Sequence, residues 1–400
     1  MPDTRRLIFI LSAVVAFGAL AIDMYLPALP SMAVDLQASA GQMQLTLSLF
    51  FAGFCAGMLI YGPLSDYFGR RKLLLSGVAL FAVTSGLCML SSNVHMLMLL
   101  RSLQALGCGA CVVMARAASR DVFSPAELPR MMSKMSLITM VAPLLAPSIG
   151  ALCLYVAGWR SIFGVLTVIA LTAGYWVYRY VPETHTPDKS HGLHLGNVLR
   201  QYANLLRDGY NLRLILCMSG AMSGMFAFIS GAPFVYTQVL GFSELQFALL
   251  FGSNIVAMSL VTTLNLQLLK RFEATTLMLY QAVVLIFAGV CLFIVALTGH
   301  LFLIIPLVIL YVSHVNALCA NGMAALLRHH PSQRAGSVTA LSSAVQFLIT
   351  ALSTSLVAVF SHSPAMAMTG VMALFALLAV LCAYQIQLNP KGASDAIRQH

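Results

Sequence analysis

Residues 62–72 read Gly-Pro-Leu-Ser-Asp-Tyr-Phe-Gly-Arg-Arg-Lys. Two glycines enclose an acid, and three consecutive basic residues begin directly after the second glycine. The stretch joins two apolar runs, 43–63 and 73–91, each close to the about 20 residues that a helix needs to cross a bilayer. A tight basic turn between two such runs is typical of a polytopic membrane protein, because loops on the cytoplasmic side are rich in Lys and Arg.

The composition of the whole chain agrees with a membrane protein. Of its 400 residues, 60% are hydrophobic and 8% are charged. Soluble domains contain roughly 25% charged residues, so this chain is too poor in charge to cover its own surface in water. The net charge of +10 is spread over the short gaps between apolar runs instead of one face or arm, which argues against nucleic acid as a partner.

Twelve apolar runs are long enough to cross a membrane. They form two sets of six: 7–29, 43–63, 73–91, 95–117, 132–156 and 161–181, then 212–238, 246–268, 275–297, 300–320, 336–360 and 364–386. We therefore predict an all-α polytopic membrane protein with twelve transmembrane helices in two pseudo-symmetric six-helix bundles. The predicted domains are an N-terminal bundle (1–182), a cytoplasmic linker (183–211) and a C-terminal bundle with a short cytoplasmic tail (212–400).

The basic residues predict the orientation of these helices. With the N-terminus in the cytoplasm, nearly all Lys and Arg outside the spans lie inside, and the outer loops contain Arg160 alone. We read the first run as a retained helix and not as a signal peptide, because it is too long and lacks a clear cleavage site. The prediction is a multi-pass protein of the bacterial inner membrane with both termini in the cytoplasm.

Asp23 is the only acid that we place inside a span. An Asp at the centre of a membrane helix costs about 2.5–3.5 kcal/mol, so it indicates a functional site. The alternative is an Asp near the outer interface, with Pro27 ending the helix and the carboxylate reaching the headgroups. Asp35, further along, is predicted to lie in the outer loop and to be solvated.

Arg101 lies in the fourth run, a few residues inside its outer end, and is the expected partner of Asp23. A buried carboxyl near a cation can bind and release a proton as its surroundings change. We therefore predict that Asp23 and Arg101 couple proton binding to conformational change. The alternative is that Arg101 extends outward to the headgroups.

The spans carry little that suits an enzyme or a channel. They contain no Gly-x-Ser-x-Gly and no second buried carboxylate, and the one His-x-x-His (His191 and His194) lies in the polar linker. The nine cysteines all fall in apolar runs, where buried small hydrophobic side chains are the expected role. In the second half Asn321 and Gln346 are predicted to line a cavity, whereas His314 is expected to be a packing residue. No metal and no cofactor other than a coupling proton is predicted.

Residues 62–72 resemble the Gly-x-Leu-x-Asp-x-x-Gly-Arg-Arg/Lys signature of the major facilitator superfamily and match it at every specified position. The resemblance implies that Asp66 faces the positive end of a neighbouring helix and that the turn latches a cytoplasmic gate. The gate residues are then Gly62, Asp66, Gly69, Arg70, Arg71 and Arg120. The spacing of Arg101 and Gln104 is similar to an Arg-x-x-Gln motif that the same superfamily ties to proton coupling.

The fifth run contains two prolines among small residues. Its residues Pro143, Ala146, Pro147 and Gly150 resemble the superfamily's antiporter motif, although Ala142, Ala146 and Ala151 stand where that motif has glycine. A kinked packing helix is the alternative, because small residues and prolines also let helices bend and approach closely.

The whole chain resembles the bicyclomycin-resistance (Bcr/CflA) branch of the drug:proton antiporters. The residues that carry this resemblance are 23–30, 44–48, 62–72, 120–121, 140–151, 182–184, 225–228 and 231–236. It implies proton-coupled efflux of small amphipathic drugs by a protein that acts as a monomer in the lipid bilayer. The alternative cargo is a metabolite such as a nucleoside or an amino-acid derivative. The predicted substrate cavity comprises Tyr25, Gln104, Met225, Phe228, Phe234, Asn321 and Gln346.

Overall fold

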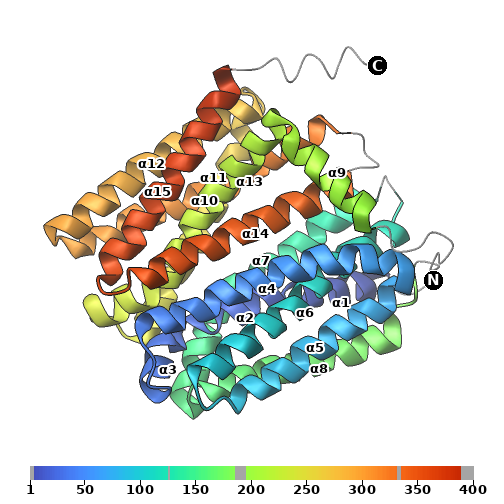
Figure 1. The fold of residues 1–400 in the computed structure, drawn as a ribbon, viewed down its shortest axis with the longest axis horizontal. Helices are drawn as coiled ribbons and strands as arrows, with labels where there is room; N and C mark the ends of the chain where they lie inside the picture. The colour runs from blue at the N-terminus through green and yellow to red at the C-terminus, as the bar shows by residue number, and fades with distance from the viewer. Residues whose placement is uncertain (1–3, 125–126, 185–194, 331–334, 389–400) are drawn as a thin grey trace. The chain divides into compact units, whose positions relative to one another are not determined.

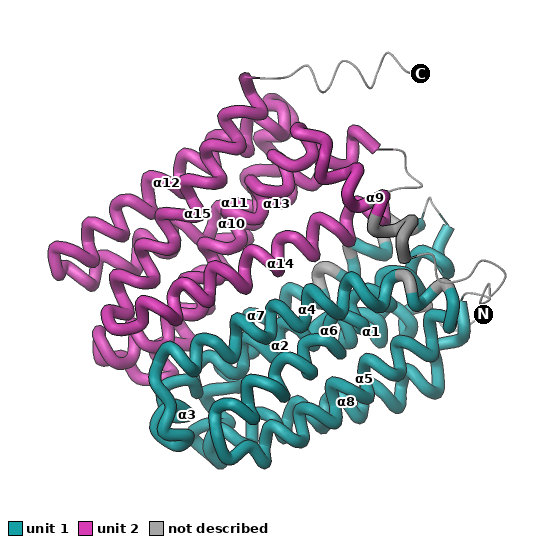
Figure 2. Tube along the Cα trace, viewed as in Figure 1, with its two compact units in different colours: residues 1–198 teal, residues 199–400 magenta. Residues whose placement is uncertain are grey.

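The computed structural model describes residues 4–124, 127–184, 195–330 and 335–388, without the side chains of residues 4, 63, 66, 128–130, 133, 136–137, 195–199 and 201. The chain divides into two compact units, residues 1–198 and 199–400 (Figure 2). The division falls within the range 183–211 that the sequence sets apart as a polar connection. His191 and His194 of that range lie outside the described residues.

Unit 1 begins with a span built from four short helices and continues with five long ones (Figure 1). The helices of the first span are α1 (Thr4–Val15), α2 (Phe17–Asp23), the 3₁₀ helix η1 (Leu26–Ala28) and α3 (Leu29–Asp35). The long helices are α4 (Ala40–Phe68), α5 (Arg70–Met89), α6 (Val94–Val122), α7 (Leu128–Ala157) and α8 (Arg160–Tyr180).

Unit 2 contains six long helices and several shorter ones, and α9 crosses into it from unit 1. They are α9 (Leu195–Arg207), α10 (Gly209–Phe234), the π-helix η2 (Val235–Val239), α11 (Glu244–Leu268), α12 (Ala274–Thr298), the 3₁₀ helix η3 (Leu301–Leu303), α13 (Ile304–Arg328), α14 (Ala335–Val359) and α15 (Pro364–Leu388). Among the described residues, twelve helical segments are long and apolar enough to cross a membrane. The prediction of twelve spans is confirmed, whereas α9 was not predicted.

The two units share one pattern of neighbouring spans. In each unit the second span packs on the fourth, the third on the fourth and sixth, and the first on the fourth, fifth and sixth. In unit 1 this pattern joins α4 to α6, and in unit 2 it joins α11 to α13. The same set of neighbours in both halves is what an internal six-helix repeat requires.

Glycines bring α4 and α6 into close contact. A Cβ on Gly57 would lie 3.2 Å from the Cα of Gly109, and a Cβ on Gly109 would lie 2.6 Å from the carbonyl oxygen of Phe54. Gly53, one turn before Gly57 on α4, faces the backbone of Ser102 in the same way. Small residues four positions apart let membrane helices approach until their backbones touch, which replaces the hydrophobic driving force that lipid does not provide.

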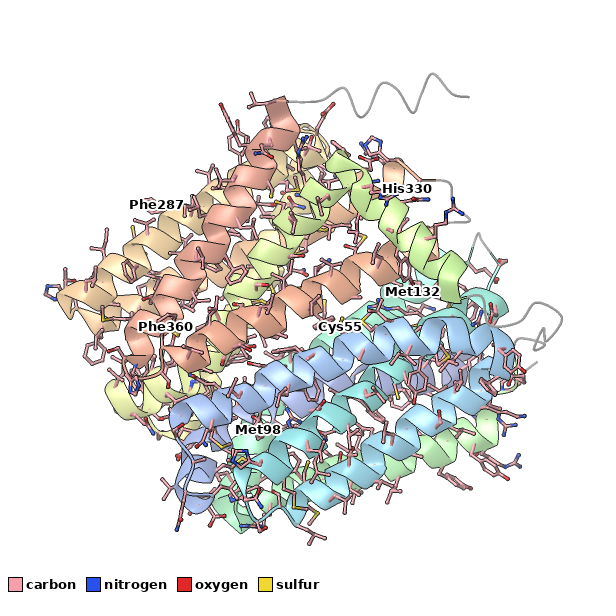
Figure 3. The ribbon with its side chains drawn as sticks, viewed as in Figure 1. Cys55, Met98, Met132, Phe287, His330 and Phe360 are labelled. Atoms are coloured by element: carbon pink, nitrogen blue, oxygen red, sulfur yellow. The ribbon has the colours of Figure 1, made fainter. Side chains whose placement is uncertain are left out.

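Large apolar side chains cover the outer surfaces of the helices. Phe287 of α12 and Phe360 after α14 are each 60% exposed and extend away from their helices (Figure 3). Such exposure would be costly in water but suits contact with lipid chains. The polar side chains are mostly small and lie inside the units, where they bond to the backbone one turn earlier, as Thr84 does to the carbonyl oxygen of Leu80 (2.6 Å).

The first span is interrupted directly after Asp23, which is the last residue of α2. Pro27 has no N–H to donate to the carbonyl of Asp23, and Pro30 has none for Leu26. Single 3₁₀-type bonds, such as Ala28 N–H to the Tyr25 carbonyl oxygen (3.1 Å), connect the pieces. The span therefore differs from the continuous helix predicted over 7–29, because its prolines remove two bonds of the ladder.

Asp35 corrects a second expectation. Asp35 is the last residue of α3, and it is bonded to protein groups instead of being only solvated. Its Oδ2 accepts a hydrogen bond from the Trp159 indole (2.8 Å) and forms an ion pair with Arg160 (2.7 Å). The Arg160 guanidinium also lies 4.2 Å from the centre of the Trp159 ring. These contacts tie the end of the first span to the turn between α7 and α8.

Candidate functional site

The turn at 62–72 is shaped around Gly69. α4 ends at Phe68 and α5 begins at Arg70, and Gly69 between them has φ +91°, which favours glycine. A Cβ at this position would also lie 2.6 Å from Oε2 of Glu183. Gly69 is therefore required both by its backbone conformation and by the approach of a carboxylate.

Glu183 caps the helix that follows this turn. Its Oε1 accepts hydrogen bonds from the backbone N–H groups of Arg70 (2.8 Å) and Arg71 (3.2 Å). These N–H groups have no partner within α5, and the helix dipole adds positive charge at the same end. The side chain of Asp66 lies outside the described side chains, so its role opposite a helix end stays a prediction.

Arg70 connects the turn to the end of α6. Its Nε lies 3.2 Å from Oδ2 of Asp121, and its Nη1 donates to the Ser65 hydroxyl. The Thr184 hydroxyl donates to the same oxygen of Asp121 (3.3 Å). Arg70, Glu183 and Asp121 thus form one network that joins α4, α5, α6 and the end of α8.

The other two arginines of the predicted gate bond to backbone. Arg71 donates from Nη2 to the carbonyl oxygen of Tyr178 (2.5 Å) and lies over the Tyr178 ring, and Arg120 donates from Nε to the carbonyl oxygen of Arg116 (3.4 Å). Gly62 has open space around it, with no described atom within 4 Å of a Cβ placed there. Within unit 1 the residues that organise the turn are therefore Arg70, Asp121 and Glu183, and the last two were not predicted as gate residues.

Replacing Glu183 with Ala is expected to lower the free energy of unfolding by about 1 kcal/mol, because two N–H groups of α5 lose their acceptor. Unfolding of the purified protein in detergent measures the change. Glu273→Ala is the matched control, since Glu273 also precedes a helix, α12, but makes no capping bond. An equal effect of both substitutions would show that the Glu183 cap contributes nothing.

The fifth-span motif meets the first span at its interruption. Gly150 of α7 packs against the backbone beside Asp23, and a Cβ on it would lie 2.9 Å from the Cα of Met24. Ala146 and Pro147 are buried on the same helix, whereas Pro143 is half-buried. Asp23 itself is 6% exposed. The motif therefore contributes close packing beside Asp23, the one acid among the described residues that is buried within a span.

Arg101 does not pair with Asp23. In the described part of the chain no hydrogen bond or ion pair joins the two side chains. The Arg101 guanidinium lies over the ring of Tyr25 instead, 4.5 Å from its centre. Arg101 is also fully buried, which excludes an extension to the headgroups.

Gln104 and Tyr25, both predicted for the substrate cavity, hold Arg101 inside unit 1. Gln104 accepts a hydrogen bond from Nη1 of Arg101 (2.5 Å) and donates to the Ser85 hydroxyl (2.7 Å). Tyr25 donates to the Thr46 hydroxyl (2.7 Å), because Thr46 donates its own proton to the Met43 carbonyl oxygen. Sequence reasoning missed this cluster, whose members are distant in the chain.

The cavity residues predicted in unit 2 lie in different surroundings. Asn321 belongs to a buried amide triad with Asn265 and Gln281, in which its Nδ2 donates to Asn265 Oδ1 (3.0 Å) and to Gln281 Oε1 (3.1 Å). Gln346 donates to the Ser342 hydroxyl one turn earlier (3.0 Å). Phe228 and Phe234 are buried and Met225 is half-buried. That these side chains face a substrate stays a prediction.

Asn321→Ala is expected to lower the free energy of unfolding by about 1–3 kcal/mol, because the buried Nδ2 of Asn265 and Oε1 of Gln281 each lose the hydrogen bond to Asn321. Asn316→Ala on the same helix is the control, since Asn316 is exposed and makes one bond to Thr262. Chemical unfolding in detergent compares the two variants. Equal stability of both would mean that the triad is not a stabilising contact.

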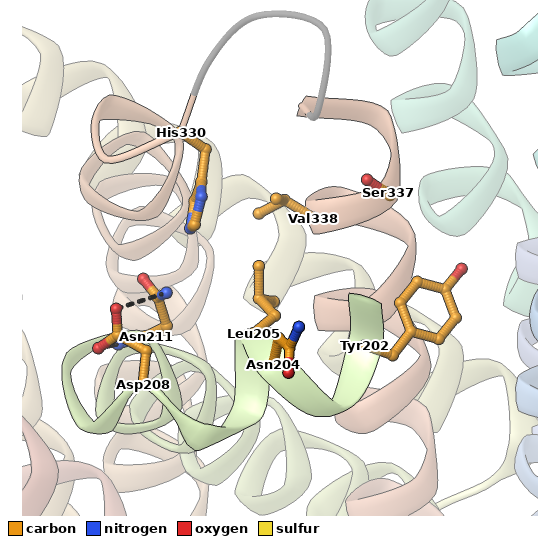
Figure 4. A pocket seen from close by; sticks show the side chains of 8 residues that line it. All are labelled: Tyr202, Asn204, Leu205, Asp208, Asn211, His330, Ser337 and Val338. Carbon is orange, nitrogen blue, oxygen red and sulfur yellow. Dashed lines mark hydrogen bonds between the residues drawn. The ribbon is translucent and has the colours of Figure 1, made fainter. Parts of the chain in front are cut away.

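A cavity of about 250 Å³ lies in unit 2 between α9, the start of α10, the end of α13 and the start of α14 (Figure 4). Asp208 caps α10 there and accepts a bond from the Asn211 side chain (3.1 Å). None of the predicted substrate residues lines this cavity. Its lining residues are Tyr202, Asn204, Leu205, Asp208, Asn211, His330, Ser337 and Val338.

Comparison with known proteins agrees with the fold of twelve spans. Residues 11–354 match the family profile of the Major Facilitator Superfamily. The chain belongs to this superfamily. Members of the Major Facilitator Superfamily transport small molecules across membranes, and this protein is accordingly a multi-pass transporter of the inner membrane.

Two relatives and one solved structure place the chain further. It is 32% identical over 376 residues to the bicyclomycin resistance protein homolog of Haemophilus influenzae, covering 94% of each chain. It is 29% identical over 290 residues to multidrug resistance protein D of Escherichia coli, covering 72% of each. A bacterial homolog of the human lysosomal transporter Spinster, in an inward-facing conformation, has the same fold, with a TM-score of 0.74 at 16% identity over 98% of each chain. The predicted superfamily and the predicted drug-resistance branch are confirmed.

Proposed function

We propose that this protein exports small amphipathic drugs across the inner membrane by alternating access, in exchange for protons. The resemblance to relatives named for bicyclomycin and multidrug resistance supports the drug as cargo. The observation that carries proton coupling is Asp23, the one described acid buried within a span, placed where the first span is interrupted. The proton is the only coupling ion in this proposal, and the protein acts as a monomer.

The surroundings of Asp23 explain how a proton drives the cycle. A charged carboxylate within a membrane span is costly unless it reaches water or a cation. Release of the proton requires a state in which Asp23 reaches water or a cation. The interrupted helix allows the segment around Asp23 to change between two arrangements, because fewer ladder bonds hold it.

The turn at 62–72 then serves as the cytoplasmic gate, with both chain termini on the cytoplasmic side. The network of Arg70, Asp121 and Glu183 keeps α5, α6 and α8 together at that end. Charge-assisted bonds of this kind form and break as a group, which suits a gate with two discrete states.

Transport by the purified protein in liposomes with an imposed pH gradient tests this function. The expected result is accumulation of amphipathic drugs against their gradient, abolished when an ionophore removes the pH difference. The same assay with nucleosides and amino-acid derivatives examines the metabolite alternative. Transport of nucleosides but of no drug in the panel would overturn the drug assignment, and drug transport unaffected by the ionophore would overturn proton coupling.

A further inference from the structure

One edge of the Arg101 guanidinium is left without an acceptor. Nη1 donates to Gln104, whereas Nε and Nη2 are buried and have no hydrogen-bond partner among the described residues. Nε–H and one N–H of Nη2 point the same way in the plane of the group. This pair is the fork with which arginine binds both oxygens of a carboxylate.

Aromatic rings occupy the faces of the same group. The guanidinium carbon lies 4.5 Å from the centre of the Tyr25 ring and 4.3 Å from that of Phe50, and Phe163 is 6.0 Å away. Rings stabilise a cation at their faces but accept no hydrogen bond at its edge. A buried charge with unmade hydrogen bonds is costly, so the rings alone do not compensate for the burial of the Arg101 guanidinium.

A chain of hydrogen bonds fixes the orientation of the Gln104 amide. The Ser85 hydroxyl donates to the Phe81 carbonyl oxygen (2.6 Å) and so accepts from the Gln104 amide nitrogen. The amide oxygen of Gln104 must then face Arg101 and take Nη1. Gln104 therefore offers Arg101 a single acceptor oxygen, and the pair of N–H groups on Nε and Nη2 stays without one among the described residues.

We propose that the Arg101 fork binds a planar carboxylate during the transport cycle. This inference rests on the proposed transport function and adds a class of cargo to it, namely amphipathic molecules that bear a carboxylate. The same chemistry is available from Asp23, if the interrupted first span carries its carboxyl to Arg101. The carboxylate of a cargo molecule and that of Asp23 would make the same pair of N–H···O bonds. They differ in that Asp23, as part of the chain, would compete with an added carboxylate for the fork.

Binding of a matched pair of probes to the full-length protein in lipid nanodiscs tests the site. The probes are 4-butylbenzoate and the neutral 4-butylbenzamide, titrated by calorimetry at neutral pH without any gradient. We expect benzoate to bind at least about tenfold more tightly than benzamide, as a charge-assisted bidentate pair adds. Arg101→Lys keeps the charge but lacks the fork and is expected to abolish the preference, whereas Arg160→Lys, at the outer turn, keeps it.

Asp23→Asn distinguishes the two sources of carboxylate. If Asp23 is the occupant, the unmodified protein shows no preference and Asp23→Asn gains it, because the amide no longer competes for the fork. If the cargo is the occupant, the preference is present already and Asp23→Asn leaves it in place. The absence of a preference in both proteins overturns the proposal, and so does a preference that persists in Arg101→Lys.

Two further measurements keep the result interpretable. If Arg101→Lys does not fold, Gln104→Met replaces it, because the guanidinium then loses the acceptor that orients it, and the preference is expected to fall at least about threefold. Binding is measured without a gradient, so a chain that prefers benzoate but fails to export drugs would keep the site and lose the proposed function. If the protein exports drugs but shows no preference for benzoate, the proposed function stands and the carboxylate site is overturned.

Discussion

Replacement of Asp23 with Asn is expected to reduce proton-driven drug transport to the level of empty liposomes while the protein remains folded. The amide has the shape of the acid but neither binds nor releases a proton near neutral pH. It also removes a costly buried acid from the span, so stability is expected to hold or rise. Transport in liposomes and thermal unfolding in detergent, measured on the same preparation, separate coupling from folding.

Asp35→Asn is the matched control for this experiment. It removes an acid from the same span, but one that is exposed and paired with Arg160 outside the apolar segment. The expected loss is at most about 1 kcal/mol of stability, as for other surface ion pairs, with transport retained. Undiminished transport by Asp23→Asn would show that Asp23 does not couple proton binding to transport, and it would remove the main support for a proton antiporter.

Replacement of Gly150 with Val is expected to have the second large effect, on folding and transport together. A Cβ at Gly150 meets the backbone of Met24, 2.8 Å from its carbonyl carbon and 2.9 Å from its Cα, and backbone cannot rotate away as a side chain does. The expected loss is about 1–3 kcal/mol, with a displaced Asp23 segment in whatever protein still folds. The melting temperature and the transport rate are both expected to fall.

Gly252→Val on α11 provides the comparison, because a Cβ on Gly252 has no described atom within 4 Å. Its melting temperature is expected to stay close to that of the unmodified protein. If both glycine variants were equally stable, the contact between α7 and the first span would not be as close as the structure places it. Retained transport by Gly150→Val would separate the fifth-span motif from the site around Asp23.

Much of this architecture follows from local sequence. The twelve spans were predictable because lipid requires each helix to satisfy its own backbone and to be apolar along its length, so that every span is visible in its own residues. The 62–72 turn was predictable because Gly69 and the basic residues after it are adjacent in the chain. Pro27 and Pro30 indicate that a helix ends near them, but only the structure shows that the helix ends at Asp23.

The contacts that define the site were not predictable in the same way. Glu183 caps Arg70 from 113 positions away, and Asn321 bonds to Asn265 across 56 positions. An arginine in a span suggests either an acid as its partner or an extension to the headgroups, because a single sequence does not show which side chains surround it. The tertiary structure surrounds Arg101 with two rings and an amide instead.

The sequence by itself determined that the chain is a twelve-span carrier of the Major Facilitator Superfamily, with one buried acid and a glycine-hinged basic turn. Composition and hydrophobic length decide the twelve spans, and the superfamily follows from the resemblance of residues 62–72 to its signature. Only the tertiary structure decided that Arg101 packs between aromatic rings with two N–H groups left without an acceptor, and that Glu183 and Asp121 organise the turn. Those arrangements depend on which faces of distant helices meet, and packing determines that choice after the spans have formed.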